Sequence, residues 1–162
     1  MIKIIDNFLP EEEFESIQSL MMGKEFNWFY SEGRSYRDDE SYQMIHMFFQ
    51  PEVGSNSEHL PIWSTFMNQV GAKKCARIKG NLTFKTPTIE VGEYHTDYDD
   101  EDMITAILYI NTTNGYTEFE SGVRVNSVAN RVCIFDSNLR HRGTTHTEGE
   151  QQRIVVNFNY ER

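Results

Sequence analysis

The sequence predicts an α+β fold, mainly β, with a jelly-roll core and two supporting helices near the N-terminus. Two segments before residue 74 carry apolar side chains at helical spacing, and about seven short β-rich runs follow them. Regular short strands of this kind are typical of a sandwich or a barrel. At 162 residues the chain fits one domain, residues 1–162, with residues 1–74 as helical and β support and residues 75–162 as the jelly roll.

The first helix is expected directly after Pro10. Proline suits the first turn of a helix, and the three glutamates that follow it complement the positive helix end. The apolar side chains of this segment then fall on one face: Phe14, Ile17, Leu20 and Met21. A second helix is expected over residues 61–70, with a core face of Trp63, Phe66 and Val70.

Between the two helices, residues 30–42 are too polar and too charged to follow either periodicity. A loop between aromatic-rich strands is expected there. Two interpretations stay open: an ordinary solvated loop, or a lid that closes over a substrate and excludes water during turnover.

The β-rich runs are short and are separated by turn signals such as Asn114-Gly115 and Ser121-Gly122. The strands are expected at residues 76–85, 88–94, 103–111, 117–119, 123–128, 131–135 and 154–160.

Composition narrows the class of function. The net charge of −10 argues against nucleic acid as a partner, because phosphate binding depends on a basic face. No segment approaches the roughly 18–20 apolar residues that cross a bilayer, so no membrane association is expected. The two cysteines, Cys75 and Cys133, are expected to be buried, reduced thiols. A soluble cytoplasmic protein is predicted, in the host cytoplasm if the source is a virus, and its oligomeric state is left open.

Four polar side chains form the pattern that carries chemistry. His95 and Asp97 lie two positions apart at a strand end, so they share a face. His141 follows a polar turn after another strand, and Arg153 begins the last strand twelve positions later. Along that strand Arg153, Val155, Asn157 and Asn159 share one face, and the opposite face is apolar. A guanidinium that points into the mouth of the barrel is therefore expected.

These residue types suit a non-haem Fe(II) site. Two histidines and one carboxylate on one face of iron leave coordination positions open. A 2-oxo acid can fill two of them through its 1-carboxylate and keto oxygen, and dioxygen the third. The distal carboxylate then needs a cation, and arginine offers a planar, permanently charged fork. The pattern predicts iron at His95, Asp97 and His141, with 2-oxoglutarate anchored by Arg153.

The stretch from about residue 77 to residue 160 also resembles a known family. The phrases that carry the resemblance are Arg77-Ile78-Lys79-Gly80-Asn81-Leu82, His95-Thr96-Asp97, Asn114-Gly115-Tyr116-Thr117, Asn130-Arg131, Phe135-Asp136-Ser137, His141-Arg142-Gly143 and residues 153–160. They are similar to the 2-oxoglutarate/Fe(II) dioxygenase superfamily, in particular its prolyl 4-hydroxylase-like members and the short relatives common in phages. The opening Ile5-Asp6-Asn7-Phe8-Leu9-Pro10 is also similar to the start of prolyl hydroxylase-like chains.

The resemblance implies a double-stranded β-helix and a hydroxylase that couples oxidation of an unactivated C–H bond to decarboxylation of 2-oxoglutarate to succinate. Its cofactors would be Fe(II), 2-oxoglutarate and dioxygen, with ascorbate as a candidate reductant. Arg153 stands where these enzymes commonly have lysine, and Asn81-Leu82-Thr83 stands where they usually have a tyrosine. Thr83 is therefore the candidate hydroxyl partner of 2-oxoglutarate, and Asn81 and Asn157 are further candidates for the same site.

The resemblance favours peptidyl proline as the substrate. Two alternatives stay open: hydroxylation of a free amino acid or small metabolite, and a non-catalytic jelly-roll binding module. The acidic run at residues 97–102 is either a solvated loop or a feature that selects basic or neutral peptides. His46, His59 and His146 are not expected to bind the metal.

Overall fold

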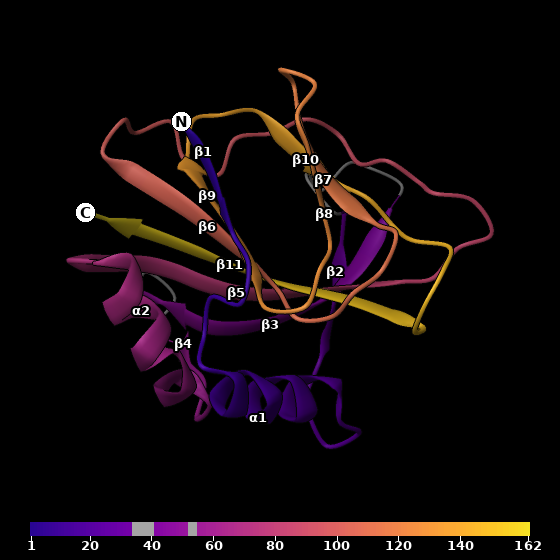
Figure 1. Cartoon of the computed structure of the whole chain (residues 1–162), viewed down its shortest axis with the longest axis horizontal. Helices are drawn as coiled ribbons and strands as arrows, with labels where there is room; N and C mark the ends of the chain where they lie inside the picture. Colours follow the sequence, from indigo (N-terminus) through magenta and orange to yellow (C-terminus); the bar gives the residue numbers. More distant parts are fainter. Residues whose placement is uncertain (34–40, 52–54) are drawn as a thin grey trace.

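Two antiparallel sheets form the body of the protein in the computed structural model, which describes residues 1–33, 41–51 and 55–162 (Figure 1). Within these residues the larger sheet has eight strands, in the order β1-β9-β6-β11-β5-β3-β2 with β4 paired to β3, and the smaller has the order β10-β7-β8. The strands are β1 (Ile2–Ile5), β2 (Phe29–Glu32), β3 (Tyr42–Gln50), β4 (Ser55–Asn56), β5 (Lys74–Phe84), β6 (Met103–Tyr109), β7 (Tyr116–Phe119), β8 (Arg124–Asn126), β9 (Arg131–Asp136), β10 (His141–Gly143) and β11 (Gln152–Glu161). The predicted mainly β, jelly-roll fold is confirmed.

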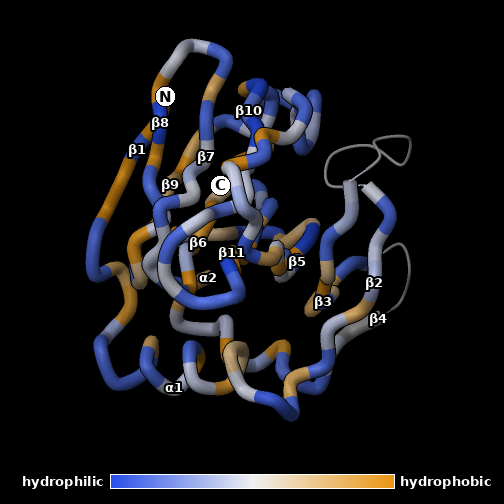
Figure 2. The backbone as a smooth tube through the Cα atoms, turned by 90° about the vertical axis from the view of Figure 1, so that its right-hand side faces the viewer, coloured by the Kyte–Doolittle hydropathy of each residue, from blue (hydrophilic) through white to orange (hydrophobic). Residues whose placement is uncertain are grey.

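The helices cover one face of the larger sheet, on the side away from β7, β8 and β10 (Figure 1). They are α1 (Glu11–Met22) and α2 (Ser64–Val70), the latter preceded by the 3-10 turn η2 (Leu60–Trp63). Both predicted helices are therefore present. Apolar side chains of both helices belong to the same core as those of β11, and the rings of Phe66 and Phe158 stack with centroids 3.8 Å apart. Blue and orange alternate along α1 in Figure 2, as expected for a helix with one buried face.

The side chains of strand β11 point alternately into two different cores. Ile154, Val156, Phe158 and Tyr160 lie in the helix-side core, in agreement with the alternation of the sequence. A smaller core lies between the two sheets and includes Val155, Tyr109 and Phe119. The space beside this second core, lined by polar residues of β5 and β11, holds the candidate site.

Three local expectations differ from the structure. Residues 88–94 form no continuous strand: Val91 makes a single bridge to Thr144, directly after β10, and His95 in the next segment makes one to His141 of β10. Pro87, directly before this segment, has no N–H for pairing. Residues 30–32, expected in a loop, belong to β2, because they pair with β3. Tyr42, at the other end of that predicted loop, begins β3. Residues 34–40 lie outside the described residues, so the lid hypothesis stays a hypothesis. The strand expected at Phe8 and Leu9, leading into the first helix, lies earlier in the chain, as β1, where it pairs with β9.

Both cysteines are free thiols. Cys133 is buried as predicted, but Cys75 is only half-buried, since it lies near the start of β5 where the register with β11 shifts. No described helix is both long and apolar enough to cross a bilayer.

Candidate metal centre

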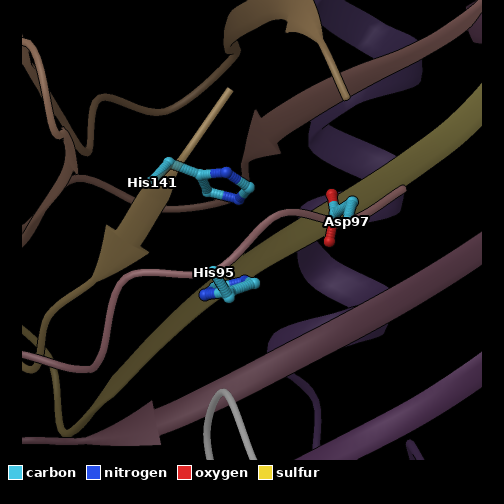
Figure 3. Close-up of side chains that lie close together, drawn as sticks. All are labelled: His95, Asp97 and His141. Carbon is cyan, nitrogen blue, oxygen red and sulfur yellow. The ribbon is translucent and has the colours of Figure 1, made fainter. Parts of the chain in front are cut away.

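The side chains of His95, Asp97 and His141 meet at one point, with one ligand atom from each within 4.8 Å of the others. Figure 3 shows that His141 projects from β10, while His95 and Asp97 come from the segment between β5 and β6. Each histidine directs its ring Nδ1 back to a carbonyl of its own segment: His95 to Glu93 at 3.2 Å and His141 to Leu139 at 2.9 Å. When Nδ1 donates to a carbonyl, Nε2 is left free to bind a metal.

Asp97 is held by hydrogen bonds on both carboxylate oxygens. Arg77 Nη2 donates to Oδ1 at 3.0 Å, and Thr105 Oγ1 and Asn159 Nδ2 donate to Oδ2 at 3.0 and 3.1 Å. Burial alone would raise the pKa of Asp97, but the charge of Arg77, assisted by His141, lowers it to about 2. Burial and the neighbouring His141 lower the pKa of His95. The site thus presents an ionised carboxylate, and burial favours the neutral His95 imidazole that a divalent metal needs.

Arg153 lies in the same cavity and lacks a counter-ion among the described residues. Its side chain is buried, and its Nε donates to Ser127 Oγ at 2.8 Å. Its Nη2 and the Oγ1 of Thr83 are buried without a hydrogen-bond partner, and the two residues face each other in the pairing of β11 with β5. Burial lowers the pKa of Arg153 to about 10, so the cation persists at neutral pH. Such orphaned donors are costly unless a ligand satisfies them.

Gly115 provides the space for the Arg153 side chain. A Cβ atom at this position would lie 2.6 Å from Arg153 Cδ and 2.8 Å from the carbonyl oxygen of Thr145. The Asn114-Gly115 turn of the sequence therefore has a packing function beside the cavity.

Solved structures with the same architecture were found across nearly the whole chain. A prolyl-4-hydroxylase from Pseudomonas putida is 16% identical, with a TM-score of 0.66 over 99% of this chain and 92% of that one. A prolyl hydroxylase from Trichoplax adhaerens, in complex with a hypoxia inducible factor peptide fragment, is 14% identical, with a TM-score of 0.69 over 99% and 83%. HygX from Streptomyces hygroscopicus, with nickel and 2-oxoglutarate bound, is 11% identical, with a TM-score of 0.61 over 99% and 82%.

The chain has the fold of the 2-oxoglutarate/Fe(II) oxygenases. The resemblance found in the sequence is confirmed at the level of the fold, including its prolyl hydroxylase-like form. No family model matches the sequence, and no curated protein matches it.

Within this oxygenase fold, the predicted site residues line one cavity of about 190 Å³. It brings together His95, Asp97, His141, Arg153, Thr83, Asn81 and Asn157. Along the paired strands, Asn81 and Asn157 lie between Arg153 and the residues that bind Asp97. Asn81 Nδ2 is 3.4 Å from Asn157 Oδ1. The geometry is thus compatible with every site residue predicted from the sequence.

The three other histidines lie elsewhere and are bound to the protein. His46 bonds to Asn27 O and Ser57 Oγ, each at 2.8 Å, and His146 bonds to Glu150 O at 2.7 Å. His59 packs on Phe26. None belongs to the group of side chains around His95.

Among the charged residues that line the cavity, sequence reasoning missed Arg77 and Lys79. Both alternate with Asn81 and Thr83 along β5, so the period-two pattern contained the signal. The pattern did not show that this face, rather than the other, borders the metal site.

Proposed function

We propose that the protein is an Fe(II)- and 2-oxoglutarate-dependent oxygenase that hydroxylates an unactivated C–H bond and releases succinate. The observation that carries the proposal is the pair of orphaned groups, Arg153 Nη2 and Thr83 Oγ1, in the cavity that also holds the His-Asp-His cluster. A metal site and a separate buried cation are the two features that a chelating diacid requires. The oxygenase fold supports the same assignment.

Each residue of the cavity has a distinct task in this proposal. The Nε2 atoms of His95 and His141 and the carboxylate of Asp97 hold the metal. Arg153 and Thr83 bind the distal carboxylate of 2-oxoglutarate, with Arg153 oriented by its hydrogen bond to Ser127. Arg77, Thr105 and Asn159 keep the Asp97 carboxylate in place. Bound Fe(II) would supply the oxidative chemistry with dioxygen that side chains cannot perform.

Peptidyl proline is the first substrate candidate, because the fold matches prolyl hydroxylases. A small molecule is the second. HygX, which shares the fold, has been solved with hygromycin B bound, so the architecture also accommodates compounds that are not peptides.

The experiment that tests the proposed function begins without oxygen. Fe(II) and 2-oxoglutarate are added to the protein, and the weak visible charge-transfer band of the chelate is recorded. The band is expected, and admission of oxygen should then release succinate. If no band forms and 2-oxoglutarate is never consumed, the protein is a non-catalytic jelly-roll binding module instead.

A further inference from the structure

The cavity carries an excess of positive charge. Among the described residues that line it, three are cationic, Arg77, Lys79 and Arg153, and one, Asp97, is an ionised carboxylate. The charges of Fe(II) and of the 2-oxoglutarate dianion would cancel each other. The excess therefore remains after both have bound, and in a cavity shielded from water such an excess is costly.

Two of the three cations have a defined partner. Arg77 forms an ion pair with Asp97 and donates from Nε to Asn159 Oδ1 at 2.9 Å. Arg153 faces the proposed distal carboxylate of the co-substrate. Lys79 is half-buried, and within the described part of the chain its Nζ has no hydrogen bond or ion pair. Burial, followed by the charge of Arg77, lowers the pKa of Lys79 to about 8.

Lys79 lies on the cavity face of β5, and its position along the paired strands differs from that of Arg153. It pairs with Asn157, whereas Thr83, four positions further along β5, pairs with Arg153. Four residues of a strand span about 13 Å. The two carboxyl carbons of 2-oxoglutarate are four C–C bonds apart, about 5 Å. Lys79 is thus placed for an anionic group other than the one at Arg153.

We propose that Lys79 binds the carboxylate of the substrate. The cavity then reverses the order of candidates given by the fold alone: the substrate is a small free acid, such as a free amino acid, rather than an internal prolyl residue of a peptide. An internal proline has no carboxylate and would leave the Lys79 ammonium uncompensated. The inference rests on the proposed function, because it assumes that Arg153 binds the distal carboxylate of 2-oxoglutarate.

The test uses the whole protein loaded with Ni(II) and saturated with 2-oxoglutarate, which does not turn over. Each of the twenty free L-amino acids and its carboxamide is titrated into this complex in a calorimeter. At least one acid is expected to bind tenfold or more tightly than its own amide. Lys79→Met should weaken the binding of that acid by tenfold or more. Lys73→Met, at an exposed position outside the cavity lining, is the matched control and should leave it unchanged.

Three results would overturn the inference: no acid binds more tightly than its amide, the acid binds equally to the Lys79→Met variant, or that variant loses affinity for 2-oxoglutarate instead. The last result would assign Lys79 to the co-substrate. If 2-oxoglutarate itself fails to bind the metal-loaded protein, the proposed function and this inference fall together. If it binds and no acid follows, only the inference falls.

Discussion

The backbones of His95 and His141 exchange two hydrogen bonds, at 3.0 and 2.9 Å, although the residues belong to distant parts of the chain. This single bridge joins the segment after β5 to β10 at the candidate ligands themselves. The two ring centroids are 4.6 Å apart, and each Nδ1 is bound to a carbonyl two residues before its own histidine. The backbone pairing therefore sets the separation of the two imidazoles before any metal binds.

Two histidine variants distinguish a metal ligand from a histidine with a structural role. His141→Ala removes one member of the His-Asp-His cluster, so the Ni(II) affinity should fall by more than the roughly 10–100-fold typical of outer-shell changes. His146→Ala is the control: it removes a buried hydrogen bond to Glu150 O, which should cost about 1–3 kcal/mol of unfolding free energy and leave Ni(II) binding intact. Calorimetric titration of both variants with Ni(II) measures the difference. Equal affinities would refute the metal assignment.

Gly115→Ala should weaken the binding of 2-oxoglutarate at Arg153 without weakening metal binding at His95, Asp97 and His141. The added Cβ meets Arg153 Cδ and a backbone carbonyl, so the arginine must move. We expect a loss of about 1–3 kcal/mol in unfolding free energy and at least tenfold weaker 2-oxoglutarate binding, with Ni(II) affinity retained. Gly143→Ala, whose Cβ would meet no atom within 4 Å, is the stability control. Wild-type affinity for 2-oxoglutarate in Gly115→Ala would contradict this account.

Thr83→Val should affect 2-oxoglutarate binding and thermal stability in different ways. The hydroxyl of Thr83 is buried and has no partner in the ligand-free protein, so its removal should leave the thermal midpoint unchanged or raise it. The same change should weaken 2-oxoglutarate binding roughly tenfold, since one hydrogen bond to a carboxylate is lost. Unfolding without ligand and titration with 2-oxoglutarate give the two values. A lower midpoint with unchanged affinity would show that Thr83 is structural.

The burial of Lys79 should be visible in the pH dependence of stability. Its pKa is lowered from 10.5 to about 8 in the folded protein, so between these values the unfolded chain binds more protons. Stability should therefore rise with pH in this window, by up to roughly 3 kcal/mol relative to Lys79→Met, which lacks the titrating group. Denaturant unfolding of the metal-free wild type and variant between pH 7 and 10.5 measures the difference. A constant difference would mean that the ammonium is solvated.

Local patterns of the sequence determined much of the final strand and of the site. The alternation of residues 153–160 correctly separated the cavity face, with Arg153 and Asn157, from the face that packs on the helices. His95 and Asp97 do belong to one cluster, as their spacing predicted, but they lie in the segment between β5 and β6 and not at the end of a strand. The alternation of residues 153–160 follows from the period of a strand, which is a property of neighbouring residues.

Only the tertiary structure decided which strands pair and what their polar faces meet. Arg77 and Lys79 look like ordinary alternating charges in the sequence, and they become cavity residues because the inner face of β5 lies beside β11 and Asp97. Likewise, residues 88–94 have the composition of a strand but make only single bridges. Pairing and register depend on contacts between distant segments, whose free energies are absent from any local window of residues.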